Sequence, residues 1–156
     1  MAITKQSPRT IHLGGRAQKL EGQAEAAISP GMLVEPGTVV GDFKKHATNA
    51  GAAQKAFALG NEYANDAVTP VYTSDDDYVA DEQVYVKVGA PGSSFWAWLT
   101  SGDSVAYGAK LESAGNGFLS AVSGSYPVCW ALETVDATAD VSEHAGGHKR
   151  IRVEVM

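Results

Sequence analysis

The chain has 156 residues, of which 44% are hydrophobic and 19% charged, and its formal net charge is −6 at pH 7. That length suits one compact domain or two very small ones, and that composition can bury a core and is not typical of disorder. The acidic balance argues against nucleic acid or an anionic membrane as a partner, because both attract basic surfaces.

The predicted elements begin with an extended arm over residues 1–15, which are polar and contain Pro8 and a Gly14–Gly15 pair. Residues 42–56 are rich in Ala but lack an apolar stripe, so we expect a polar loop with at most one helical turn. Turn signals recur about every 8 to 12 residues, as in all-β barrels and sandwiches. The predicted strands cover residues 16–28, 32–35, 38–40, 57–59, 84–88, 95–99, 105–107, 110–112, 117–121, 128–133 and 151–155.

These elements predict one all-β domain over residues 16–156, a small β-barrel or β-sandwich of the β-tulip kind with quasi-duplicated halves. The duplication rests on three pairs of similar segments, offset by 77, 73 and 67 residues. The pairs are 28–35 with 105–112, 56–62 with 129–134, and 81–88 with 150–155. The chain is therefore expected to be one small β unit built twice, and no catalytic residue recurs in it.

Two clusters of residues contain possible metal ligands. The acidic run Asp75–Asp77 could hold a hard cation through its carboxylates, but it lacks the ligand spacing and glycine of a calcium loop. His144 and His148 are four residues apart, as in a helical zinc site, but the Gly146–Gly147 pair between them disfavours a helix. We expect a solvated turn and a loop, with no bound metal and no cofactor.

Sequence motifs for catalysis are missing. The chain has no nucleophile elbow, no phosphate-binding loop and no dinucleotide fingerprint. Cys129 is the single cysteine, and its apolar neighbours predict a buried thiol rather than a nucleophile. We therefore expect no catalytic residue and no enzyme activity. A small hydrolase would have to use His144 or His148 with Asp136 or Asp140.

Residues 95–99, Phe-Trp-Ala-Trp-Leu, give the strongest local signal. Strand alternation puts Trp96 and Trp98 on one face and Phe95 on the other. Either one of these faces meets a partner, or the strand is buried on both faces inside a barrel; the sequence leaves both open. A third interpretation is a glycan-binding β module that uses Trp96 and Trp98 as stacking platforms.

Five short motifs follow one another behind the N-terminal arm. They are Ile-Ser-Pro-Gly-Met-Leu-Val at 28–34, Phe-Ala-Leu-Gly-Asn-Glu at 57–62, Gly-Asp-Ser-Val at 102–105, Gly-Ala-Lys-Leu at 108–111 and Ala-Leu-Glu at 131–133, with a closing charged strand at 151–155. From about residue 24 to residue 155, this order resembles the capsid decoration, or cement, proteins of tailed bacteriophages.

The resemblance implies a virion protein made in the host cytoplasm that binds the outer surface of an icosahedral capsid. It implies the major capsid protein as partner, bridging of capsid subunits, and a homotrimer on the capsid. An arm that cannot fold alone can add a strand to a neighbour's sheet. The residues expected to contact partner proteins are Arg9, Thr10, Ile11, Phe95, Trp96 and Trp98.

Overall fold

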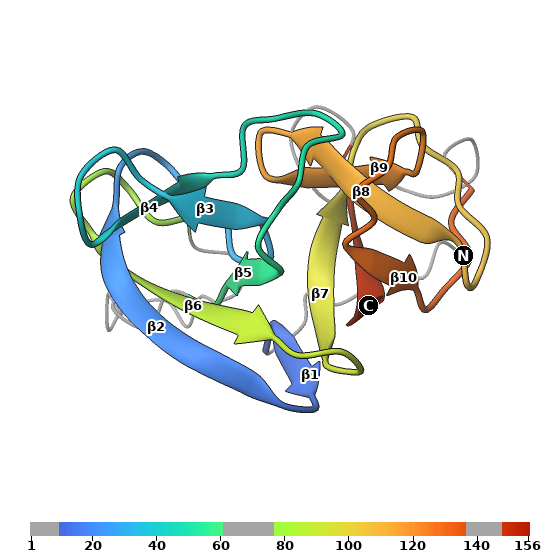
Figure 1. The fold of residues 1–156 in the computed structure, drawn as a ribbon, viewed down its shortest axis with the longest axis horizontal. Helices are drawn as coiled ribbons and strands as arrows, with labels where there is room; N and C mark the ends of the chain where they lie inside the picture. Colours follow the sequence, from blue (N-terminus) through green and yellow to red (C-terminus); the bar gives the residue numbers. More distant parts are fainter. Residues whose placement is uncertain (1–9, 61–76, 137–147) are drawn as a thin grey trace, which may run out of the picture.

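The structure is a computed structural model that describes residues 10–60, 77–136 and 148–156. These ranges form strands and turns without a helix, which confirms the all-β prediction (Figure 1). Within them, therefore, no helix is long and apolar enough to cross a membrane. The strands are β1 His12–Gly14, β2 Ala17–Ala24, β3 Val34–Pro36, β4 Asp42–Lys45, β5 Ala56–Ala58, β6 Gln83–Gly89, β7 Ser94–Leu99, β8 Lys110–Gly115, β9 Phe118–Ala121, β10 Cys129–Ala131 and β11 Lys149–Val155.

Strand β11 shows why such segments become strands. Ile151, Val153 and Val155 are buried, and Arg152 between them is exposed. Alternate side chains of a strand point to opposite faces, and β-branched side chains suit the pleated, half-buried surface. One face of β11 therefore forms core while the other meets solvent.

Strands β7 to β11 close into a five-stranded barrel. They pair antiparallel in the order β7-β11-β10-β8-β9, and β9 returns to pair parallel with β7 at Leu119 and Leu99. Strand β1 pairs with β7 on the edge opposite β11, beside Phe95, and is the additional strand of this sheet. Closing the sheet in this way satisfies the backbone groups that open edge strands expose.

Strands β2 to β6 form the other sheet, in the order β3-β4-β2-β6-β5. Its two edges meet where Leu33, just before β3, bridges to Phe57 of β5. Figure 1 shows β2–β6 on the left of the molecule and β7–β11 on the right. We call β2–β6 the first half and β7–β11 the second half.

The two halves repeat one pairing scheme. The parallel pair β2–β4 of the first half corresponds to the parallel pair β7–β9 of the second. Three pairs of facing residues in the first half have equivalents in the second half: Ala56–Val88 corresponds to Cys129–Val155, Glu35–Lys44 to Glu112–Ser120, and Leu20–Val86 to Phe95–Val153. The backbone hydrogen bond from Gly31 N–H to Ala58 O likewise corresponds to the one from Gly108 N–H to Ala131 O. The predicted duplication is therefore confirmed, and it extends to all five strands of each half.

Residues 10–15 correct the predicted arm. Ile11 is buried, its carbonyl accepts a hydrogen bond of 2.8 Å from Trp96 N–H, and β1 pairs antiparallel with β7. This part of the chain belongs to the barrel because β7 offers a free edge and the core has room for Ile11. Residues 1–9 lie outside the described ranges.

Three shorter predictions are also corrected. Residues 42–45, expected in a loop, form β4, because they pair with β2 and β3, which local sequence does not reveal. Residues 38–40, expected as a strand, belong to the turn before β4. Within 105–107, only Val105 makes a bridge, to Val135.

Candidate functional site

Three of the residues predicted to contact partner proteins lie in the chain's own core. Phe95, Ile11 and Trp98 are 0%, 1% and 3% exposed. Side chains with so little exposed area cannot meet a partner while the fold is intact. The prediction is therefore corrected for these three, and β7 proves to be buried on both faces, the second alternative left open by the sequence.

The other predicted contact residues keep some exposed surface or lie outside the structure. Thr10 is exposed and Trp96 is half-buried. For these two, contact with a partner stays a prediction. Arg9 lies outside the described residues.

Strand β7 is buried on both faces because the two halves pack across it. On one face, the ring of Phe95 stacks on Phe57 of the first half, with 4.8 Å between the ring centres. On the other, Trp98 Nε1–H donates a hydrogen bond of 2.8 Å to Pro30 O. The guanidinium of Arg150 lies 4.2 Å from the Trp98 ring centre, a cation–π contact. Trp98 is thus unavailable as a sugar-stacking platform.

Each half also lends side chains to the core of the other. Leu33 and Phe57 of the first half belong to the hydrophobic cluster inside the second half. Trp98 belongs to the cluster inside the first half, and Phe118 packs against that cluster. Because neither core is complete alone, the halves are expected to fold as one cooperative unit.

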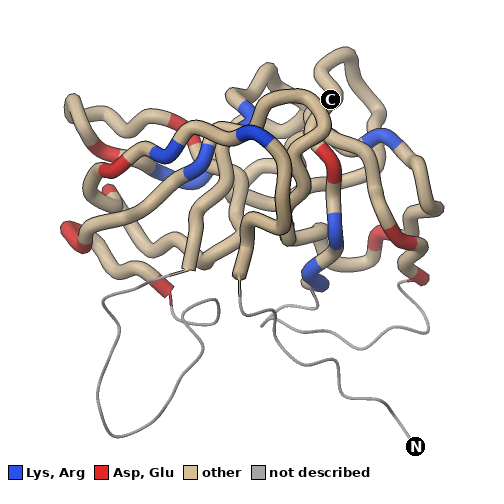
Figure 2. The backbone as a smooth tube through the Cα atoms, turned by 90° about the horizontal axis from the view of Figure 1, so that it is seen from below, with Lys and Arg blue, Asp and Glu red and all other residues tan. Residues whose placement is uncertain are grey.

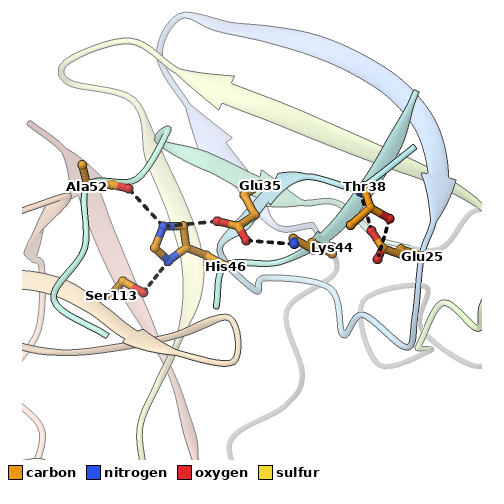
Figure 3. Close-up of polar contacts among 7 residues, drawn as sticks. All are labelled: Glu25, Glu35, Thr38, Lys44, His46, Ala52 and Ser113. Atoms are coloured by element: carbon orange, nitrogen blue, oxygen red, sulfur yellow. Dashed lines mark hydrogen bonds and ion pairs between the residues drawn. The ribbon is translucent and has the colours of Figure 1, made fainter. Parts of the chain in front are cut away.

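A polar network spans the junction between the halves (Figure 3). His46 Nδ1 lies 2.7 Å from Ser113 Oγ, and its Nε2 lies 3.1 Å from Ala52 O and 3.5 Å from Glu35 Oε2. A carbonyl oxygen only accepts, so His46 Nε2–H donates to Ala52 O. The Ser113 oxygen in turn accepts a bond of 3.2 Å from Gly115 N–H.

This network combines a serine, a histidine and a glutamate, as acyl-transfer sites do. However, Ser113 and His46 are 0% and 2% exposed, so the hydroxyl cannot reach a substrate. Ser113 comes from β8 of the second half, whereas His46 follows β4 of the first. The network therefore fixes the position of one half on the other.

Glu112, the counterpart of Glu35, is a buried carboxylate. It accepts hydrogen bonds from Ser123 N–H and Oγ–H, both 2.8 Å, and from Gly124 N–H at 3.0 Å. Burial by itself raises the pKa of the Glu112 carboxyl, but these hydrogen bonds outweigh it and hold the pKa below its usual range. The carboxylate fastens β8 to the loop that follows β9.

His12 on β1 contacts Lys87 on β6, with 2.9 Å between Nδ1 and Nζ. The Nδ1 atom therefore accepts from the ammonium, and the ring lies 5.0 Å from the ring of Phe95. Burial, and then the Lys87 charge, lower the pKa of His12 below its ordinary value. This contact joins β1 to the first half.

The candidate metal and hydrolase residues are only partly described. Asp75, Asp76, Asp140 and His144 lie outside the described ranges. Within those ranges, no group of three or more potential ligands could hold a metal ion. His148 stacks on Phe118 with 3.7 Å between ring centres, and its Nδ1 accepts a hydrogen bond from Ser101 N–H.

The predicted burial of Cys129 is confirmed. Cys129 is 0% exposed, and burial raises the pKa of its thiol far above its usual range. A thiol held in this protonated form is a poor nucleophile.

Sequence reasoning missed the exposed apolar side chains. Val39 and Val40 are 63% and 102% exposed, and Tyr107 and Tyr126 are 71% and 54% exposed. Val39 and Val40 were placed in a strand, and Tyr107 in another, so their exposure was not foreseen.

The charged residues of the described chain are interspersed. Figure 2 shows Lys and Arg among Asp and Glu along both halves rather than gathered on one of them. The Lys44–Glu35 ion pair joins β4 to β3, and the Arg152–Glu133 ion pair joins β11 to the bend after β10, with N–O distances of 3.6 and 3.8 Å.

Comparison with known proteins shows a likeness of fold. No protein-family model matches the chain, and no curated protein sequence matches it. Among solved structures, it is similar to the N base of head fiber gp8.5 in bacteriophage phi29, with a TM-score of 0.56 and 10% sequence identity. The alignment covers 90% of this chain and 95% of that chain. The two proteins therefore share a fold over nearly their full compared length.

Proposed function

We propose that this protein is a structural component of a bacteriophage virion that binds the outer surface of an icosahedral capsid. In this role it bridges subunits of the major capsid protein, carries no catalytic activity and acts as a homotrimer. The observation that carries the proposal is the fold likeness to a phage head fiber base over 95% of that chain. The motif order described above points to the same class of protein.

The structure supports this role through its rigidity. The two halves share cores and a buried polar network, so the chain can transmit load between two attachment points without bending at a linker. Multivalent attachment across a lattice makes modest single contacts strong in sum. Trp96 and Thr10 remain the predicted contact residues with exposed surface.

The direct test is to purify virions of the phage that encodes the chain and to measure its copy number by quantitative mass spectrometry. We expect a fixed ratio to the major capsid protein. Capsids lacking the protein should recover it when purified protein is added before sedimentation, and they should then release DNA at a higher temperature. Absence of the chain from washed virions would overturn the proposal.

The predicted arm can be tested in the same assay. Deleting residues 1–9 leaves Ile11 and β1 in place, whereas deleting residues 1–13 also removes Ile11 from the core. If the arm mediates attachment, the shorter deletion should abolish binding to capsids while the far-UV spectrum and the unfolding midpoint stay unchanged. Full binding by this variant would contradict the role of the arm.

A further inference from the structure

The contact between the two halves is one-sided. Leu33 N–H of the first half donates to Gly117 O of the second at 2.9 Å, and Gly117 N–H donates to His46 O at 3.1 Å. A two-fold arrangement would also join Lys110 and Gly41, the counterparts of Leu33 and Gly117. Instead, Gly41 O accepts from Gln23 N–H of its own half. The interface is heterologous: the two halves contribute different surfaces to it, and the equivalent of each surface in the other half takes no part in the contact.

Two surfaces take part in this contact. The docking face of the first half consists of residues 30–33 with Phe57, and the docking turn of the second half consists of residues 115–117 between β8 and β9. Their unused counterparts are residues 107–110 with Trp130 in the second half, and the turn at 39–41 in the first half.

The glycines of these surfaces show which of the equivalent surfaces are in contact with the other half. A Cβ added to Gly31 would lie 2.9 Å from Trp96 O, and one added to Gly117 would lie 2.9 Å from Met32 Cβ. Their counterparts Gly108 and Gly41 have no atom of the chain within 4 Å. All four glycines have a φ between 79° and 95°, so the backbone shape is kept where the contact is missing.

The unused face at 107–110 is aromatic and carries one cation. Tyr107 is 71% exposed, and Trp130 is half-buried beneath the ammonium of Lys110, which lies 5.2 Å from the ring centre. Tyrosine and tryptophan supply large contact areas at protein interfaces. Among the described residues, no segment covers this face as the second half covers Leu33 and Phe57.

The unused turn at 39–41 is apolar and well anchored. Val39 and Val40 are 63% and 102% exposed, and Asp42 follows them where the second half has Phe118. Thr38, just before the turn, donates from N–H and Oγ–H to the two oxygens of Glu25, at 2.8 and 3.1 Å (Figure 3). The valines are therefore presented on a fixed turn.

We propose that the turn at 39–41 of one copy docks on the 107–110 face of a second copy, repeating the junction between the halves. The exposed valines meet Tyr107 and Trp130, and Lys110 faces the end that carries Asp42. A heterologous contact of this kind continues from copy to copy, so it builds a closed ring or an open filament. The proposal rests on the internal repeat and does not depend on the proposed function.

Cross-linking between two single-cysteine variants tests this contact. Ala109 is the counterpart of Met32, which touches the docking turn, and Val40 adjoins Gly41. Val40→Cys mixed with Ala109→Cys should give a covalent dimer on treatment with a short bismaleimide, because native Cys129 is buried. The matched control is Val79→Cys mixed with Ala109→Cys, since Val79 is 62% exposed and lies outside both surfaces. A several-fold excess of dimer is expected over this control, and equal yields would overturn the proposal.

Sedimentation velocity over a range of concentrations provides a second measurement on the unmodified chain. The sedimentation coefficient should rise with concentration, and either Val40→Asp or Tyr107→Ala should remove most of the rise. Val79→Asp should leave it unchanged. A chain that stays monomeric at every concentration, or an association that neither variant weakens, would overturn the proposal. Neither result alters the presence of the chain in virions, which tests the proposed function separately.

Discussion

The first and second halves have the same strands, the same register and the same turn glycines, but they differ where they touch each other. At the docking face, Leu33 and Phe57 of the first half are buried, whereas the corresponding Lys110 is exposed and Trp130 is half-buried. Backbone pairing is thus kept between the copies, while side chains diverge according to what covers them.

The same divergence marks β2 and β7. Trp98 of β7 is buried in the first half's cluster, whereas Gln23, in the corresponding position of β2, is exposed. A surface covered by a neighbouring half favours large apolar residues, and the same surface facing water favours polar ones. The comparison therefore separates the residues that form a barrel from those that join two barrels.

The largest expected effect comes from making β7 resemble β2. Trp98→Gln removes a buried indole from the first half's core and the hydrogen bond to Pro30 O. Loss of a large buried aromatic side chain costs about 3 to 5 kcal/mol of unfolding free energy. Urea denaturation followed by circular dichroism measures this loss.

The reciprocal variant is the matched control. Gln23→Trp places an indole on an exposed strand face, where substitutions usually change stability by less than about 0.5 kcal/mol. If both variants destabilise the protein equally, β7 does not hold the two halves together more than β2 does, and the proposed difference between these strands is wrong.

A smaller effect is expected from the two equivalent glutamates. Glu112→Gln weakens three hydrogen bonds to a buried carboxylate and should cost about 2 kcal/mol. Glu35→Gln removes a partly exposed ion pair with Lys44 and should cost less than about 1 kcal/mol. Chemical denaturation of both variants at pH 7 compares them directly, and a larger cost at Glu35 would contradict this assignment.

The pH dependence of Glu112 sharpens that comparison. Its pKa is lower in the folded chain than in the unfolded chain, where the pKa of a glutamate is about 4.3. The unfolded state therefore binds the proton first as the pH falls, and the stability that Glu112 contributes is present above that value and lost below it. The difference in unfolding free energy between wild type and Glu112→Gln should shrink from pH 5 to pH 3. A constant difference would contradict the lowered pKa of Glu112.

The sequence predicted the fold class, the duplication and most strands because these depend on local patterns. Alternating β-branched residues marked β11, and a repeated glycine turn marked the entry to each half. Strand β4 escaped prediction because its register depends on contacts with β2 and β3 rather than on its own residues. β1 was missed because residues 12–14 form a strand only by pairing with the edge of β7, which the local sequence does not reveal.

The candidate contact residues could not be assigned from the sequence alone. Alternation correctly placed Phe95 and Trp98 on opposite faces of β7, but it could not show that both faces lie within the protein. The same limit applies to Val40, whose exposure follows from its position in a turn. Aligning the two halves on their register supplies the missing signal, because a buried residue and its exposed counterpart then identify the junction.

The smallest expected effect concerns β1, the strand without a counterpart in the repeat. Burial and the Lys87 ammonium lower the pKa of His12, so the folded chain favours the neutral ring. Lys87→Met removes the charge but keeps the length of the side chain, so the pKa of His12 should rise toward its ordinary value. Proton NMR titration of the imidazole signals measures this shift.

Lys19→Met is the control, because that ammonium lies 4.0 Å from the ring centre of Tyr85 rather than on His12. Since the unfolded chain binds a proton at His12 more readily, the wild type should lose stability as the pH falls below about 6.5, and Lys87→Met should lose less. If both lysine variants shift His12 alike, the contact between β1 and β6 does not form in solution, and β1 would be attached to the second half alone.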